Sequence, residues 1–165
     1  MERHNPGRRR TADHLYASAL SLARTGETFD RLRGLQGVEG EALLLVLEAS
    51  RADGRSGVTE PEPITPGRLG RELRLPSASV TAVVDRLERG GHLRRVRDTG
   101  DRRKVLLLPT EEAEHAHTTY WGGLDERIVE VMERFSPGEL SIVDRFLRGA
   151  TAVTEGYRAE REEHP

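Results

Sequence analysis

The sequence contains no cysteine and few aromatic residues, with one Trp, three Tyr and three Phe among 165 residues. The absence of cysteine excludes disulfides, thiolate metal sites and thiol-based redox sensing. No run approaches the roughly 18 apolar residues that a membrane span needs, and the N-terminal residues include no apolar signal-peptide segment. We therefore expect a cytoplasmic protein that makes no membrane contact. With 35% apolar and 33% charged residues, it should be a soluble, helical domain with a core of modest volume.

Motifs for catalysis or cofactor binding are also missing. Gly67 and Gly70 lie in a helical pattern with no preceding strand, so they do not form a phosphate-binding loop. His115 and His117 are two residues apart on a predicted helix and point to different faces, which argues against a shared metal ion. No spacing of Ser, His and Asp marks a nucleophile. We therefore predict no enzyme activity, no cofactor and no metal site.

Residues 64–109 contain the pattern of a helix, a turn, a second helix and a hairpin. Thr65 is a side-chain cap for the first helix, and Pro66 occupies its first helical position. Leu75-Pro76-Ser77 should end this helix and cap the next. The second helix has apolar residues at i, i+3, i+4 and i+7, which form one stripe facing the core: Val80, Val83, Val84 and Leu87.

The segment after the second helix predicts a β-hairpin. Gly90 and Gly91 stop the helix, because glycine tolerates the left-handed conformation of a C-terminal cap. Residues 93–97 and 103–108 are strand-like runs on either side of a turn at 98–101. This order of elements predicts a winged helix-turn-helix, a fold that binds duplex DNA.

Positive charge is concentrated in the same segment. Residues 65–108 contain 11 Lys plus Arg against 5 Asp plus Glu, a balance of +6 in a chain whose net charge is -2. Because each phosphate neutralised by a cation releases counterions, a concentrated basic face favours double-stranded DNA as the partner. The alternative is a winged helix that serves only as a protein-interaction module, which would have an apolar patch on its exposed face.

The flanking segments predict additional helices. Residues 1–10 are expected to be a disordered basic tail, and residues 11–50 to form N-terminal core and dimerisation helices. Within the latter, residues 38–49 are apolar nearly all round, so this helix should be buried at the centre of the domain. Residues 51–63 lack periodicity and contain two prolines, which predicts a surface loop. Residues 110–160 should form C-terminal dimerisation helices.

Two start signals define these C-terminal helices. Thr110 caps a helix that should run to about residue 135, and Ser136 with Glu139 forms a capping box for the last helix. The apolar excess of these helices predicts a homodimer, which would also set two recognition helices about 34 Å apart. The last helix has these apolar residues at spacings of three and four: Leu140, Val143, Phe146, Leu147, Ala150, Val153 and Tyr157.

From about Leu15 to Tyr157 the chain resembles the MarR family of bacterial transcriptional regulators. The resemblance is most specific over residues 80–110, VTAVVDRLERGGHLRRVRDTGDRRKVLLLPT. It implies a mostly α fold with a small β-hairpin wing, in which Arg103 enters the minor groove and Asp101 helps to hold the wing. A narrow minor groove concentrates negative potential, which suits an arginine at the tip of a hairpin.

The resemblance also implies which residues contact DNA. Ala82 stands where the family often has a larger polar residue, so base contacts should depend on short hydroxyl side chains, which discriminate weakly between bases. Gly70 and Pro109 also depart from the family pattern. The predicted contacts are the hydroxyls of the second helix and the charged residues of that helix and the wing: Ser77, Ser79, Thr81, Arg86, Arg89, Arg95, Arg97, Asp101, Arg102 and Arg103.

Taken together, the resemblance predicts a repressor that binds a pseudo-palindromic operator as a homodimer. It further implies a pocket between the dimerisation helices and the DNA-binding region, where a small anionic or phenolic effector would release the DNA. The candidates by position are Tyr16, Arg24, His115 and Trp121. For each of them, ordinary packing or a place in the dimer interface is the alternative.

Overall fold

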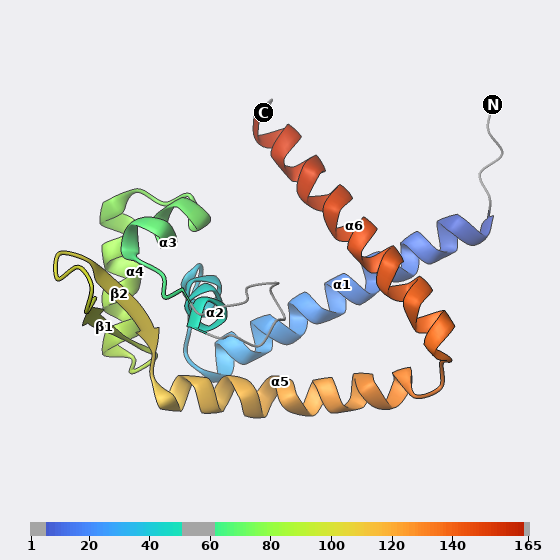
Figure 1. Cartoon of the computed structure of the whole chain (residues 1–165), viewed down its shortest axis with the longest axis horizontal. Coiled ribbons are helices and arrows are strands. Elements are labelled where there is room, and N and C mark those ends of the chain that lie inside the picture. The colour runs from blue at the N-terminus through green and yellow to red at the C-terminus, as the bar shows by residue number, and fades with distance from the viewer. Residues whose placement is uncertain (1–5, 51–61, 164–165) are drawn as a thin grey trace. The chain divides into compact units, whose positions relative to one another are not determined.

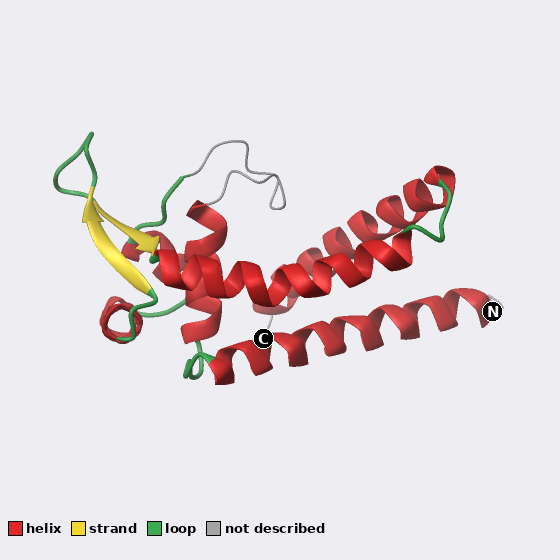
Figure 2. Ribbon diagram, turned by 90° about the horizontal axis from the view of Figure 1, so that it is seen from below, coloured by secondary structure: helices red, strands yellow, loops and turns green. Residues whose placement is uncertain are grey.

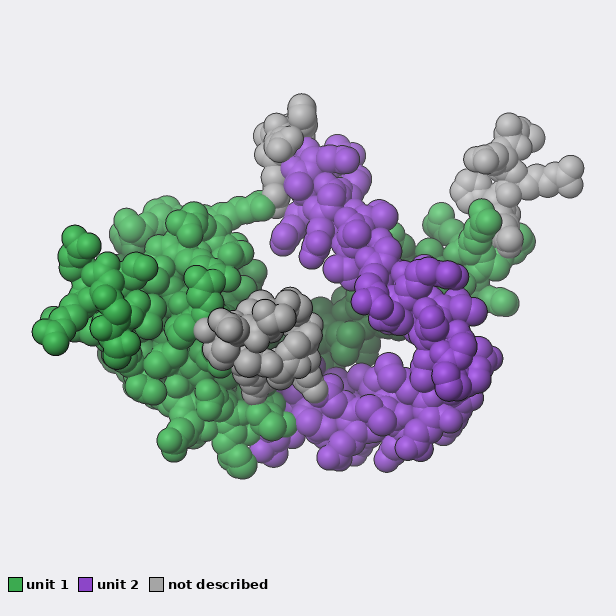
Figure 3. Space-filling view, viewed as in Figure 1, with its two compact units in different colours: residues 1–118 green, residues 119–165 purple. Residues whose placement is uncertain are grey.

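The computed structural model describes residues 6–50 and 62–163, and it divides into two compact units, residues 1–118 and 119–165 (Figure 3). Most of the described residues are helical, and the two strands pair in a hairpin (Figures 1 and 2). This architecture confirms the predicted fold class. In chain order, the elements are α1 Pro6–Leu32, α2 Glu39–Ser50, α3 Pro66–Leu73, α4 Ser77–Arg89, β1 Leu93–Arg97, β2 Val105–Pro109, α5 Glu111–Met132 and α6 Pro137–Glu163.

The core of the first unit is built around α2. This helix contacts α1, α3, α4 and β2, and its buried side chains join Leu69 of α3 and Leu107 of β2 in one apolar cluster. Its neighbours leave one face uncovered, so Leu44 is 43% exposed. The helix therefore lies at the centre of this core, as its apolar pattern predicts, except at the exposed Leu44. The buried α2 residues of the cluster are Ala42, Leu43, Val46 and Leu47.

The helix-turn-helix begins as the sequence predicts. Thr65 Oγ1 accepts a hydrogen bond from the backbone N–H of Arg68 at 3.2 Å, and Pro66 opens α3. Arg74 ends α3 in the left-handed conformation, with φ at 54°. The predicted segment Leu75-Pro76-Ser77 does separate the two helices: Pro76 occupies the cap position of α4 without a side-chain hydrogen bond, and Ser77 is the first helical residue.

The apolar stripe of α4 is confirmed, since all four of its residues are buried. The β-hairpin differs from its prediction at the second strand, which covers Val105–Pro109 in place of 103–108. The backbone N–H of Lys104 donates to the carbonyl of Asp101 at 2.8 Å, so the turn takes up residues that the pattern predicts as strand. Pro109 pairs with Leu93 at the end of the ladder and is buried.

The N-terminal helix is longer than its pattern predicts. α1 begins at Pro6 and continues without interruption through Gly26. The predicted disordered tail is therefore wrong for residues 6–10, which form the first turns of α1 with proline at the first helical position. Residues 1–5 lie outside the described residues, as do residues 51–61 of the predicted loop.

Both predicted C-terminal start signals are present. Ser136 Oγ accepts from the Glu139 N–H at 3.4 Å, and Glu139 Oε2 accepts from the Ser136 N–H at 2.8 Å, which completes the capping box of α6. The preceding helix, α5, ends at Met132, three residues before the predicted position. Of the helices described, none is both long enough and apolar enough to cross a membrane.

Thr110 links the end of α4 to the start of α5. Its hydroxyl donates to the Gly91 carbonyl at 2.7 Å and accepts from the Ala113 N–H at 3.2 Å. We expect Thr110→Ala to lower the free energy of unfolding by about 1–2 kcal/mol, because both hydrogen bonds are lost. Urea denaturation measures this change. Thr110→Ser keeps the hydroxyl and should lose less than half as much; equal losses would show that the hydroxyl contributes little.

Candidate nucleic-acid interface

The exposed side of α4 presents short hydroxyl side chains. Ser77, Ser79 and Thr81 are all solvent-exposed, whereas the opposite side of the helix lies in the core. The Thr81 hydroxyl donates to the Ser77 carbonyl at 3.0 Å, which leaves its lone pairs available as acceptors. Arg89, in the last turn, is also exposed and donates from Nε to the Asp85 carbonyl at 3.2 Å. This side of α4 therefore combines hydrogen-bonding groups with positive charge.

The tip of the hairpin is ordered by two aspartates. Asp98 Oδ1 accepts from the Gly100 N–H at 2.7 Å, and Asp101 Oδ1 accepts from the N–H and the Nε of Arg103 at 3.1 and 3.2 Å. These two hydrogen bonds hold the pKa of Asp101 below its usual value, so the carboxylate stays ionised beside the arginine. The Arg103 side chain is still 92% exposed. Arg97 and Arg102 are exposed as well.

Two of the predicted contacts form ion pairs with carboxylates of other helices or strands. Arg86 forms an ion pair with Glu39 of α2. Arg95 of β1 donates to Asp85 Oδ1 at 2.6 Å and forms a second ion pair with Glu88. The sequence pattern gave no sign of these pairs, because a linear pattern does not show which carboxylate a long side chain will meet.

A cavity of about 500 Å³ lies between α3 and α4. Ser77 and Thr81 line it together with Arg71 and Arg74, so two further arginines border the exposed hydroxyls. Arg71 and Arg74 are not among the DNA contacts predicted from the sequence. The available signal was their position just before α4, within the basic segment, where backbone-contacting cations are expected.

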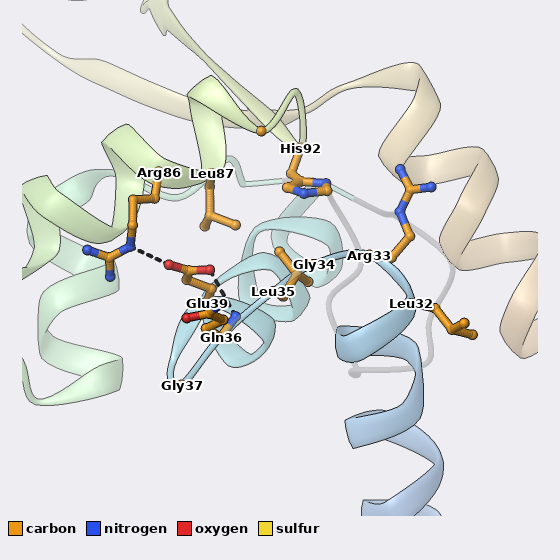
Figure 4. Close-up of a pocket in the computed structure, with 11 residues that line it drawn as sticks. Leu32, Arg33, Gly34, Leu35, Gln36, Gly37, Glu39, Arg86, Leu87 and His92 are labelled. Atoms are coloured by element: carbon orange, nitrogen blue, oxygen red, sulfur yellow. Dashed lines mark hydrogen bonds and ion pairs between the residues drawn. The ribbon is translucent and has the colours of Figure 1, made fainter.

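A second cavity, of about 740 Å³, lies at the turn that follows α1 (Figure 4). Arg33, Glu39, Arg86 and His92 are its charged or titratable lining residues. Burial and the positive charge of Arg33 lower the pKa of His92, so this ring is neutral at pH 7. The cavity therefore combines two guanidinium groups with a neutral imidazole and one carboxylate.

The four predicted effector-binding residues line neither of these two cavities. Tyr16, Arg24 and His115 are exposed on their helices, and Trp121 packs edge-to-face on Tyr120, with ring centroids 5.5 Å apart. His117 is buried while His115 is exposed, as expected for different faces of one helix. Among the described residues, no three His, Cys, Asp or Glu side chains converge on a possible metal position.

Two helices joined by a tight turn, followed by a basic hairpin with an ordered tip, define a winged helix-turn-helix. Residues 58–104 match the model of the MarR family. A transcriptional regulator from Bacillus subtilis (strain 168), named as the uncharacterized HTH-type YcgE, is 32% identical over 98 residues. That alignment covers 59% of this chain and 64% of the relative, which is slightly less than two thirds of its length. Over residues 58–104, which include both helices of the helix-turn-helix, this chain is therefore similar to the MarR family.

Solved structures share the fold over nearly the whole chain. A MarR family protein from Bacillus stearothermophilus has a TM-score of 0.63 at 23% identity, covering 93% of this chain and 99% of its own. FabT from Streptococcus pneumoniae, solved in complex with DNA, has a TM-score of 0.60 at 20% identity, covering 89% of this chain and 98% of its own. Because the sequence identities are only 23% and 20%, these similarities show a shared fold alone.

Proposed function

We propose that this chain is a DNA-binding transcriptional regulator that binds a pseudo-palindromic operator as a homodimer and represses transcription. The observation that carries the proposal is the exposed basic surface formed by α4 and the wing. In this arrangement α4 enters the major groove and the wing reaches the adjacent minor groove. FabT, which has the same fold, was solved with DNA bound. The residues proposed to contact DNA are Ser77, Ser79, Thr81, Arg89, Arg97, Arg102 and Arg103, and Asp101 holds the wing.

The exposed surface distinguishes DNA binding from a protein-interaction module. A module that binds a protein partner needs an apolar patch on its exposed face. Within residues 62–118, however, no large apolar side chain is exposed. Hydroxyls and arginines occupy that surface instead, which favours a phosphate-lined partner.

Exposed apolar side chains elsewhere support the homodimer. Tyr16, Leu20 and Leu22 are exposed on α1, and the large apolar residues of α6 other than Leu140 are also exposed. Surfaces of this kind on one chain are expected to be covered by a partner, and a second copy supplies an identical surface by two-fold symmetry. The two copies of α4 would then meet successive turns of the major groove.

The test is a salt-dependent titration of the purified protein against duplex from its own promoter region and against random duplex. Tight, promoter-selective binding that weakens steeply with salt is expected. Weak and equal binding to promoter fragments from its own locus and to random duplex would contradict specific regulation there and favour the protein-interaction module. A reporter assay then distinguishes repression from activation.

The wing contact gives a separate prediction. Arg103→Ala should weaken operator binding by about 1–3 kcal/mol, because a cation at the minor groove is lost, while the unfolding transition stays unchanged. Fluorescence anisotropy at matched salt measures the affinity. Arg145→Ala removes an exposed arginine from α6 and serves as the control, with affinity unchanged. Wild-type affinity of the Arg103→Ala variant would contradict the wing assignment.

Release of DNA by a small anionic or phenolic effector is the final part of the proposal. Its support is the 740 Å³ cavity, where Arg33 and Arg86 keep further guanidinium N–H groups, beyond those in their ion pairs with Glu112 and Glu39, to bind a carboxylate or phenolate. Salicylate at millimolar concentration is the probe, added to the protein–operator complex. The expected result is release from wild type but not from Arg33→Gln; release from neither contradicts an effector of this class at this cavity.

A further inference from the structure

Two arginines of the DNA-binding region are engaged by carboxylates on opposite flanks of α4. We infer that Arg86 and Arg95 are positioning residues, which hold α4 at a fixed rotation about its own axis and act on DNA binding through that rotation. This inference rests on the proposed DNA-binding function. It assigns to Arg86 and Arg95 a role different from direct contact with phosphates or base edges.

The first flank is held by Glu39, in the first turn of α2. Its side chain receives the Nε of Arg86 on one oxygen and the Gln36 N–H, at 2.9 Å, on the other (Figure 4). Glu39 is only 6% exposed. If Arg86 moved to a phosphate, it would leave a carboxylate buried without its cation, and that is costly. The pair is therefore expected to persist when the protein binds DNA.

The ionisation of Glu39 agrees with this pairing. Burial alone would raise the pKa of its carboxyl, but the hydrogen bonds from Arg86 and from the Gln36 N–H outweigh burial and hold the pKa below the usual value. The carboxylate is thus charged at neutral pH. The guanidinium of Arg33 and the carboxylate of Glu112 form their own ion pair at 3.0 Å, and the neutral His92 ring adds no charge of its own.

The second flank is held by the wing. Arg95 reaches from β1 to Asp85 and Glu88 of α4, and its backbone N–H also donates to Glu88 at 3.3 Å. One guanidinium therefore binds two carboxylates of α4 and offsets part of their negative charge. The Arg95 side chain is half-buried, in contrast to the exposed Arg103 at the wing tip.

The spacing along α4 explains why both flanks matter. Each residue turns an α-helix by about 100°, so Arg86 and Glu88 are separated by about 200° and lie on nearly opposite sides. An ion pair on one flank alone still allows the helix to rotate about its axis. Ion pairs on both flanks oppose this rotation. Side chains extend about 5–6 Å from the axis, so a roll of about 20° displaces their ends by about 2 Å. Such a shift exceeds the distance range of a hydrogen bond to a base edge.

The decisive experiment compares Glu39→Gln, Arg86→Gln and the double variant in operator titrations over a range of salt. Each single variant should weaken binding about tenfold, and the double variant should be no weaker than either, because one interaction is removed in all three. The slope of log affinity against log salt should not change. Arg103→Ala serves as the control and should lower that slope by about 0.9.

A direct phosphate contact by Arg86 predicts the opposite pattern. In that case Arg86→Gln lowers the slope, and Glu39→Gln leaves affinity unchanged or tightens binding, since it releases a cation and removes a negative charge. Either result overturns the inference for Arg86. If Glu39→Gln does not fold, Glu39→Asp retains the charge but shortens its reach to Arg86, and the same weakening is expected.

Hydrogen exchange on the free protein tests the positioning role without DNA. The amides of α4 should exchange about tenfold faster in Glu39→Gln, Arg86→Gln and Arg95→Gln, and at the wild-type rate in Arg103→Ala. Unchanged exchange in the first three variants overturns the inference. Absence of specific binding by the wild-type protein would instead contradict the proposed function, and the exchange rates would still show whether the ion pairs hold α4.

Discussion

Replacement of Phe146 and Leu147 together by alanine is expected to separate the proposed dimer into monomers and weaken operator binding about 100-fold or more. Both side chains are 44% exposed on α6. Apolar area of this kind stabilises a dimer by about 25 cal/mol per Å² buried, and truncating two large residues at its centre removes much of that gain. A monomer contacts one half-site, so the effective concentration that joins the two half-sites is lost. Neighbouring exposed apolar residues of α6 are Ile142, Val143, Val153 and Tyr157.

Sedimentation velocity measures the assembly state, and operator titration measures the affinity of the same samples. Arg148→Ala is the matched control on α6, because its exposed ion pair with Asp144, four residues earlier, contributes little to stability. That control should remain dimeric and bind as wild type does. A Phe146→Ala/Leu147→Ala variant that sediments as an unchanged dimer would place the interface elsewhere.

Gly70→Ala is expected to lower the free energy of unfolding by about 1–3 kcal/mol, although alanine favours helix over glycine. A Cβ at this position would lie 2.9 Å from Val80 Cγ2 and 3.3 Å from the Leu75 carbonyl oxygen. The Leu75 carbonyl belongs to the backbone of the turn, and Val80 is buried. Neither group can move away without disturbing the packing of α3 on α4, so operator affinity should fall along with stability.

Gly67→Ala provides an internal control in the same helix. A Cβ there meets no atom within 4 Å, so the substitution should stabilise the protein by about 0.5–1 kcal/mol through helix propensity alone. Thermal and urea unfolding of both variants measure the difference. Similar values for the two would show that α3 and α4 can separate enough to accept a methyl group.

The reason for glycine at position 70, where the chain departs from the family pattern, cannot be predicted from the sequence. As a pattern, glycine inside a helix predicts only a loss of stability relative to alanine. The structure supplies the reason for glycine, namely the close approach of α3 to Val80 and to the turn before α4. The same turn makes Pro76 the cap position of α4, a choice that the predicted segment Leu75-Pro76-Ser77 leaves open.

In the hairpin, too, some features could be predicted from the sequence and others could not. Its existence and its first strand follow from β-branched and apolar residues bounded by turn formers, and Leu93–Arg97 is confirmed. The second strand starts two residues later than predicted, because the side chains of Asp98 and Asp101 bind backbone amides and lengthen the turn. Strand ends depend on such local competition, which a propensity pattern does not resolve.

Local sequence is sufficient to predict the order of elements, the buried stripe of α4, and the caps at Thr65, Thr110 and Ser136. These features depend on residues within about four positions of each other, where helical geometry alone sets the contacts. The partners of Arg86 and Arg95, in contrast, depend on how the folded chain brings distant residues together. Arg86 meets Glu39 from 47 residues away, and a flexible, charged side chain takes whichever carboxylate the chain topology brings within its reach.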